Sequence, residues 1–401
     1  MSSEQEHVCK KRKISKENVK QQAAAEAEAE VVRVNQEAFT KSQIILKRQS
    51  LGLAPGDLTQ FEQLLSLGAN NQSGIVINSF LRRSDEGKAL AAIGPSDTII
   101  SIQTRKYNWP ISYQFGTYGS GPGQFDEPSC VAITSAGDIV VCDRFNHRVQ
   151  VFHSDGQFVR AWGSQGAALG QFYFPRSVTM SSTDEVFVAD TSNHRIQVFR
   201  FDGSFMRAWG SKGAAPGQFQ YPFGVALHGD LVLVSDEFNH RIQCFGLDGT
   251  FVRMWGSQVA APGQFNCPQG LAVSSAGEVF VCDEHNHRVQ VFGLDGTYLR
   301  SWESKGNVPG QFQQPTRVAV SPVGSQTESA TLPLRGFGEV LVSDQTRVQV
   351  FLANGTFVRS MYLPAGANGN FHPSGMAVTH AGDVVVCDVR NHRVYIEPAG
   401  A

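Results

Sequence analysis

From about residue 106 onward, short apolar runs alternate with brief polar stretches. In one copy of the pattern the runs span residues 130–133, 139–142, 149–152 and 158–162. The Asp155-Gly156 pair before the last run is a strong hairpin signal. Successive positions in the runs are β-branched or aromatic, as in strands that are buried on both faces. Each copy therefore predicts a meander of four short antiparallel strands.

A polar signature follows the second run of every copy. Its aspartates are Asp143, Asp190, Asp236, Asp283, Asp344 and Asp388, at spacings of 44 to 61 residues. Its arginines, which open the third run, are Arg148, Arg195, Arg241, Arg288, Arg347 and Arg393. We expect each aspartate to pair with its arginine across a turn that an asparagine such as Asn146 tolerates. A set repeated in every copy has no need to be catalytic, so we interpret it as structural.

A repeat of this length that holds four strands is typical of a propeller. The signature resembles the NHL-repeat family, including the propellers of tripartite-motif NHL proteins, over about residues 111–397. The resemblance implies an all-β, six-bladed β-propeller of four-stranded antiparallel blades. The last copy stops after three runs, so we predict that residues 113–118 complete it and close the ring. We predict a charged, disordered or helical tail at 1–55, a short helical or linker segment at 56–105, and the propeller at 106–401.

Charge and cysteine content limit the choice of partner and compartment. After residue 100 the chain carries 21 basic against 24 acidic residues, which does not favour nucleic acid. Seven cysteines without a CxxC motif indicate a reducing compartment, so we expect a cytoplasmic protein. The basic cluster at residues 10–13 leaves nuclear import open. No run is long enough to span a bilayer, and no membrane role is expected.

Histidine follows the signature asparagine at His147, His194, His240, His287 and His392. One histidine per blade on a wide ring cannot converge on one ion, so we expect neither metal nor cofactor. Some propeller lyases with NHL-like repeats hold zinc with central histidines, which the first runs here lack, and we predict no enzyme activity. Only His7 and Cys9 precede residue 130, too few zinc ligands for the RING finger or B-box that many animal NHL proteins carry. A role in the ubiquitin pathway would therefore come through a partner ligase.

The links between blades and the turns after the second strands share one face, and their residues vary between copies. Variable loops on a rigid scaffold commonly carry function. The candidate binding residues on this face are Arg144, Phe145, Tyr173, Arg176, Tyr221, Phe223, Phe238, His285, Arg317 and Arg390. Their mixed charge surroundings favour a protein or peptide ligand, and single-stranded RNA on the same face remains the alternative. An equal alternative for each aromatic is packing between blades. The sequence indicates no oligomeric state.

Arg317 stands out among the residues that open the first strand. The corresponding residues of the other copies are small: Cys130, Ser177, Gly224, Gly270 and Gly375. We predict that Arg317 projects into the mouth of the central channel as a contact for an anion or carboxylate. The alternatives are that it pairs with a neighbouring acid or fills space in a divergent blade.

Overall fold

The computed structural model describes residues 107–108, 113–303, 305–321, 338–362 and 371–398. The predictions made for residues 1–55 and 56–105, including the basic cluster, lie outside these residues. Most of the insertion in the fifth copy lies outside them as well. Among the described residues, no helix is long and apolar enough to cross a membrane.

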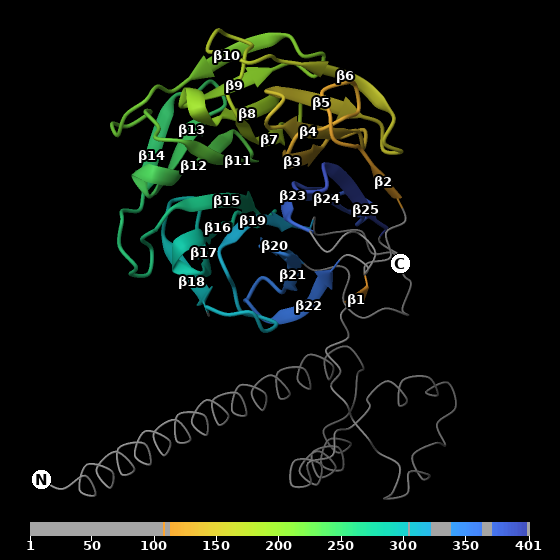
Figure 1. Cartoon of the computed structure of the whole chain (residues 1–401). Coiled ribbons are helices and arrows are strands. Elements are labelled where there is room, and N and C mark those ends of the chain that lie inside the picture. The colour runs from red at the N-terminus through yellow and green to blue at the C-terminus, as the bar shows by residue number, and fades with distance from the viewer. Residues whose placement is uncertain (1–106, 109–112, 304, 322–337, 363–370, 399–401) are drawn as a thin grey trace, which may run out of the picture. The chain divides into compact units, whose positions relative to one another are not determined.

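Six sheets surround a central axis, and the first strand of each lies nearest the centre (Figure 1). Blade 1 contains β3 (Pro128–Ile133), β4 (Ile139–Asp143), β5 (Arg148–Phe152) and β6 (Phe158–Trp162). Blade 2 contains β7 (Pro175–Met180), β8 (Val186–Asp190), the 3-10 turn η3 (Thr191–Asn193), β9 (Arg195–Phe199) and β10 (Phe205–Trp209). Blade 3 contains β11 (Pro222–His228), β12 (Leu231–Asp236), η4 (Glu237–Asn239), β13 (Arg241–Gly246) and β14 (Phe251–Trp255).

The second half of the ring repeats this plan, and two strands from the N-terminal side of blade 1 join blades 5 and 6. Blade 4 contains β15 (Pro268–Val273), β16 (Val279–Asp283), η5 (Glu284–Asn286), β17 (Arg288–Phe292) and β18 (Tyr298–Glu303). Blade 5 contains β19 (Pro315–Val320), β20 (Val340–Asp344), β21 (Arg347–Phe351) and β22 (Phe357–Tyr362), with β1 (Tyr107–Asn108) added in parallel to β22. Blade 6 contains β23 (Pro373–Val378), β24 (Val384–Asp388) and β25 (Arg393–Glu397), with β2 (Tyr113–Phe115) as its fourth strand.

Ring closure depends on β2. It pairs antiparallel with β25, so that Phe115 lies opposite Val394. The first strands contact one another in the order β3, β7, β11, β15, β19, β23 and back to β3. The predicted six-bladed propeller, closed by an N-terminal strand, is confirmed. Blades 1 and 4, 2 and 5, and 3 and 6 therefore face each other across the channel.

A phenylalanine from each link forms a wedge between two blades. The fully buried wedge residues are Phe125, Phe172, Phe219, Phe265 and Phe312. Phe219 packs in one apolar cluster with Val198 of blade 2 and Phe245 of blade 3. Its ring centroid lies 5.6 Å from that of Phe245. The recurring Gly-Gln-Phe of the links thus serves packing between blades.

The tryptophan that ends a fourth strand covers the Asp-Gly turn of the next blade. A Cβ atom added to Gly249 would stand 2.8 Å from Cδ2 of Trp209, and Gly249 has φ +90°. Glycine is required there for both reasons, since a side chain would be strained and would also collide with the indole.

Candidate functional site

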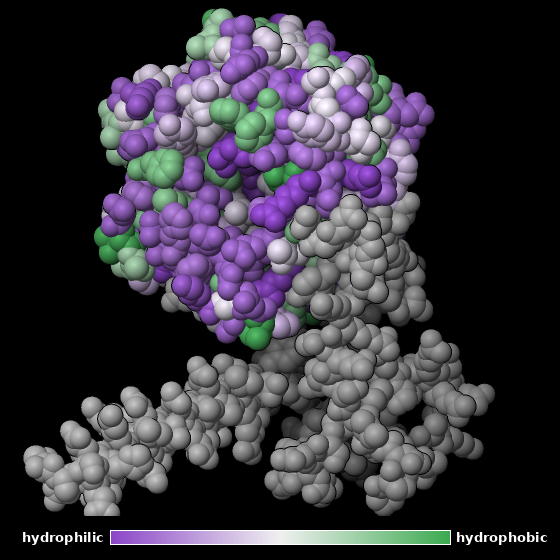
Figure 2. All heavy atoms as spheres, viewed as in Figure 1, coloured by the Kyte–Doolittle hydropathy of each residue, from purple (hydrophilic) through white to green (hydrophobic). Residues whose placement is uncertain are grey.

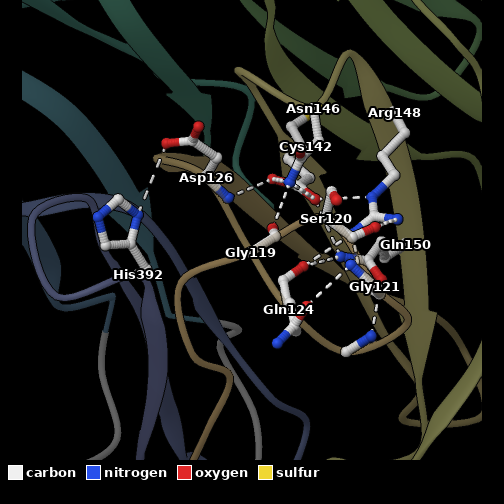
Figure 3. Close-up of polar contacts among 12 residues, drawn as sticks. Gly119, Ser120, Gly121, Gln124, Asp126, Cys142, Asn146, Arg148, Gln150 and His392 are labelled. Carbon is white, nitrogen blue, oxygen red and sulfur yellow. Dashed lines mark hydrogen bonds and ion pairs between the residues drawn. The ribbon is translucent and has the colours of Figure 1, made fainter.

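The signature residues form a buried network that holds the inter-blade link in place. In blade 1, Oδ2 of Asp143 accepts hydrogen bonds from Nε of Arg148 at 2.7 Å, Nδ2 of Asn146 at 2.9 Å and Nε2 of Gln150 at 3.0 Å. The guanidinium also donates to link carbonyls, which belong to Ser120, Gly121 and Gln124 (Figure 3). One buried carboxylate thus organises both its own turn and the preceding loop.

The same guanidinium–carboxylate contact recurs around most of the ring. It joins Asp190 to Arg195 at 2.7 Å, Asp236 to Arg241 at 2.8 Å, Asp283 to Arg288 at 2.7 Å and Asp344 to Arg347 at 3.0 Å. In blade 6, Arg393 instead donates to Oε1 of Gln114 at 3.2 Å, and Asp388 accepts from Asn391. The pair predicted for Asp388 and Arg393 does not form there, because the closing strand β2 brings Gln114 to the guanidinium.

Histidine, and not asparagine, takes the left-handed conformation in the signature turn, which corrects the sequence interpretation. His194 has φ +56°, and its Nδ1 accepts the backbone N–H of Tyr221 in the next link at 3.2 Å. The equivalent bonds run from Phe174, Cys267, Gln314 and Glu127 to His147, His240, His287 and His392. Each of these rings therefore joins one blade to the next.

The mouth of the central channel is a cavity of about 360 Å³ on the face of the links and signature turns. Five of the ten predicted binding residues line it: Arg144, Arg176, Phe223, Arg317 and Arg390. We call this cavity, together with Glu127, Gln269, Glu284 and His372 in its wall, the channel mouth. Figure 2 shows one face of the molecule, on which hydrophilic residues dominate and hydrophobic ones are scattered.

The other five predicted residues lie outside the cavity. Phe145, Tyr173, Tyr221, Phe238 and His285 belong to the same turns and links, and the first four form what we call the aromatic rim. Phe145 is 38% exposed, Tyr173 39% and Phe238 46%. The rings also pack in pairs. For example, the ring centroids of Tyr221 and Phe238 lie 5.3 Å apart. Both alternatives considered for these aromatics therefore apply, since the same rings pack locally and face solvent.

Arg317 crosses the channel from blade 5 to blade 2. Its Nη2 donates to the backbone carbonyl of Arg176, and its guanidinium carbon lies 4.2 Å from the ring centroid of Phe223. The side chain is 5% exposed, and its Nε has no hydrogen-bond partner among the described residues. Within the described part of the chain, it forms no ion pair with a neighbouring acid.

Phe223 is shared by two guanidinium groups. That of Arg176 lies 4.9 Å from its ring centroid, close to the distance found for Arg317. Burial lowers the pKa of Arg176 to about 10, which still leaves it charged at neutral pH. The Phe223 ring attracts both guanidinium groups by cation–π contact and holds them near each other despite their mutual repulsion.

Acidic groups stand on the other side of the mouth. Nε2 of Gln269 donates to Glu284 at 2.5 Å and to Glu237 at 3.4 Å, and so holds the two carboxylates together. Burial raises the pKa of both glutamates. Across the channel, Arg144 of blade 1 pairs with Glu127 at 2.9 Å. The mouth is therefore polarised, with its arginines on blades 5, 6, 1 and 2 and this acidic pair on blades 3 and 4.

Comparison with known proteins identifies the repeat. The family model described as "NHL repeat" matches residues 125–152, 172–199, 265–292 and 372–396. Four of the six blades, namely blades 1, 2, 4 and 6, thus contain a segment that matches the NHL repeat. Curated relatives include the B-box type zinc finger protein ncl-1 of Caenorhabditis elegans, 45% identical over 74 residues, and protein brain tumor of Drosophila melanogaster, 40% identical over 73. Each match covers 18% of this chain, and 8% and 7% of those two proteins, respectively.

Solved structures of low sequence identity share the fold of this propeller. A gluconolactonase from Xanthomonas campestris superposes with a TM-score of 0.51 at 15% identity, covering 69% of this chain and 87% of its own. A putative gluconolactonase gives 0.51 at 13% identity, covering 71% and 92%. These likenesses show the architecture alone.

Two sets of functional residues escaped the sequence interpretation. The first comprises fully buried glutamines two residues after the signature arginine: Gln150, Gln197, Gln243, Gln290 and Gln349. Their signal was available, because an amide recurs at one position of a buried strand. The second comprises Gln269, Glu284 and His372 in the wall of the mouth, which belong to the predicted variable face but are not among the ten candidate binding residues. Gln269 and His372 each occur in one blade alone, and Glu284 has a glutamate counterpart only in Glu237 of blade 3, so no pattern that runs around the ring marks them.

The described residues contain no group of three or more His, Cys, Asp or Glu side chains placed to hold a metal ion. The cysteines of the second strands, Cys142, Cys282 and Cys387, are fully buried, and burial raises the pKa of each thiol well above its usual value. These thiols therefore stay protonated and unreactive. Recognition is the chemistry that the channel mouth supports best.

Proposed function

We propose that this NHL propeller is a non-enzymatic scaffold that binds a protein segment on the face formed by the channel mouth and the aromatic rim. The observation that carries the proposal is the polarised cavity beside half-exposed aromatic rings. Phe145 and Phe238 stand in the turns that also supply Arg144 and Glu237. Aromatic and arginine side chains around a pocket are typical of the energetic centre of a protein interface.

Charge favours a protein ligand over single-stranded RNA. A polynucleotide needs a groove that is positive along its path. Here Glu127 and Glu284 lie in the cavity wall, and Glu237 lies beside Glu284. These carboxylates would repel a phosphate chain that entered the mouth, whereas they would not repel a polypeptide with few charges.

A scaffold without enzyme activity would act in regulation only through the proteins that it binds. Any contribution to ubiquitin-dependent control would come through a ligase bound as a partner. We also propose that the chain catalyses no reaction of its own, because the buried polar groups of the blades are engaged in the signature network.

A crosslinked pull-down from lysate tests the proposal, with the full chain as bait and both protein and RNA scored. The test variant changes Phe145, Tyr221 and Phe238 together to Ala. The matched control changes Phe158, Val252 and Leu299 to Ala, three similarly exposed apolar residues on fourth strands. We expect a specific protein that the control retains and the test variant loses. Retention of that protein by both variants would contradict the proposal, as would RNA captured in the same pattern.

A further inference from the structure

We infer that the channel mouth binds one carboxylate group of the bound protein segment, either a free C-terminus or an Asp or Glu side chain. This inference rests on the proposed function and names what the same site recognises. It assigns the anion contact to the guanidinium groups of Arg317, Arg144 and Arg176, which line one cavity.

Buried donors without partners are the first support. Among the described residues, Nε of Arg317 and Nε of Arg144 are buried and have no hydrogen-bond partner. The other nitrogens of these groups have contacts, since Arg144 pairs with Glu127 and Arg317 donates to the carbonyl of Arg176. Each unpaired Nε–H still carries a desolvation penalty that these contacts offset only in part. A carboxylate in the mouth would accept these bonds in the planar, two-pronged geometry that guanidinium groups favour.

The scaffold around Arg317 is the second support. Its neighbour on blade 4 is Gly270, where a Cβ atom would stand 2.7 Å from Cα of Arg317 and 3.2 Å from its Cδ. The neighbouring blade thus leaves space for this one long side chain. Phe223 and the carbonyl of Arg176 then hold the guanidinium in one orientation. A group held in place before binding loses little conformational freedom when the ligand arrives.

The glutamates in the cavity wall limit the negative charge of a ligand that can bind there. Glu284 and Glu127 line the same cavity of about 360 Å³ as the arginines. A single carboxylate placed beside Arg317 and Arg176 gains attraction without a second negative charge near the glutamates. A polyanion would place further charges near them and would be repelled. The fitting segment therefore carries one acidic group among neutral or basic residues.

Synthetic peptides provide the test. An array of mixed eight-residue peptides with free C-terminal carboxylates is probed with the full chain. A second array carries the same sequences as C-terminal amides, and a third replaces internal Asp and Glu with Asn and Gln. We expect bound peptides to lose at least about tenfold in affinity in whichever array neutralises the recognised group. The pattern of loss distinguishes a C-terminus from a side chain.

Variants locate the effect at the mouth. Arg317→Gln and Arg176→Gln should each weaken the same peptides by about tenfold or more. Arg200→Gln is the control, because Arg200 is an exposed arginine between β9 and β10. Arg317→Gly provides a second variant at the key position, since three other blades carry Gly there. Thermal unfolding checks that every variant is folded.

Several outcomes would overturn the inference. They are equal binding of amidated and neutralised peptides, unchanged binding by the Arg317 variants, and no retained peptide at all. Arg317-dependent binding of mixed-sequence RNA 20-mers, run in parallel, would overturn it as well. A partner captured through the aromatic rim but indifferent to Arg317 would refute the carboxylate site and leave the proposed function standing.

Discussion

The signature network and the channel mouth use the same kinds of side chain in opposite ways. In the network, Arg195 donates to Asp190 at 2.7 Å and to the carbonyls of Ala167, Ala168 and Gln171 at 2.7 to 2.9 Å. In the mouth, Arg317 has one carbonyl acceptor and an aromatic ring, and its Nε has no partner within the described chain. Both arginines are largely removed from water.

The difference separates structural from functional polar groups. A network repeated blade after blade can saturate every donor, because each copy meets the same neighbours. The mouth is built from residues that differ in each blade. Because no repeated neighbour supplies an acceptor, some of their hydrogen-bond donors have no partner among the described residues. Among the described residues, the buried guanidinium nitrogens without a hydrogen-bond partner are Nε of Arg144 and Nε of Arg317, and both lie at the mouth.

The largest expected effect comes from opening the network. Asp190→Ala should lower the free energy of unfolding by about 3–5 kcal/mol, because it leaves the buried guanidinium of Arg195 without its counter-charge. Urea unfolding followed by circular dichroism measures the loss. Asp202→Ala, at an exposed Asp-Gly turn, is the control and should change stability little. Equal losses in the two variants would mean that the network does not hold the fold.

The second effect tests how tightly the links are fitted. Gly210 has φ +102°, and a Cβ atom there would stand 2.6 Å from Cδ2 of the wedge residue Phe219. Gly210→Ala should therefore cost about 1–3 kcal/mol of unfolding free energy through strain. Gly217 lies in the same link with φ +79° and has nothing within 4 Å of its added Cβ. Gly217→Ala carries the conformational cost without the collision, so a loss as large as that of Gly210→Ala would rule out steric fit as the cause.

The sequence predicts most of the network because the network repeats. The blade number, the strands and the Asp–Arg pairing of five blades follow from residues that recur in every copy, although Arg347 follows its aspartate by three residues where the other arginines follow by five. The role of His194 did not follow, because its acceptor bond reaches Tyr221 in the next link. The parallel strand β1 beside β22 was not predicted, because it belongs to no repeat.

The mouth was only half predictable, for a geometric reason. Arg317 was singled out because its counterparts in the other blades are small. It contacts Arg176, which lies 141 residues away in the sequence, and this contact forms only when the ring closes. The pairing of Glu237 and Glu284 through Gln269 likewise joins blades 3 and 4. Such contacts depend on which blades meet, and local sequence patterns do not contain that information.

The third prediction sharpens the contrast on the side of the mouth. Arg317→Gly should change the free energy of unfolding by less than about 1 kcal/mol, because the lost contacts are offset by removal of an incompletely paired buried charge. The measurement is the same urea titration used for Asp190→Ala. A loss as large as that of Asp190→Ala would show that Arg317 belongs to the scaffold, and the contrast between the two regions would fail.

The smallest expected effect is the pH dependence of carboxylate binding. Burial lowers the pKa of His372 below 6.5 and raises the pKa values of Glu237 and Glu284 above 4.5. These groups face Arg176, Arg317, Arg390 and His285 around the mouth. As the pH falls from about 7 to about 5, each proton taken up makes the mouth more positive, while a C-terminal carboxylate stays ionised. Affinity for a carboxylate peptide should therefore rise about two- to fivefold.

Fluorescence polarisation with a peptide retained from the array measures this change. The double variant Glu237→Gln, Glu284→Gln should bind more tightly at neutral pH and keep only the part of the pH dependence that the histidines near the mouth contribute. Affinity that falls steadily from about pH 7 to about pH 5 would contradict the prediction. It would mean that the glutamates attract a basic group of the ligand more strongly than the arginines attract its carboxylate, which would reverse the polarity assigned to the channel mouth.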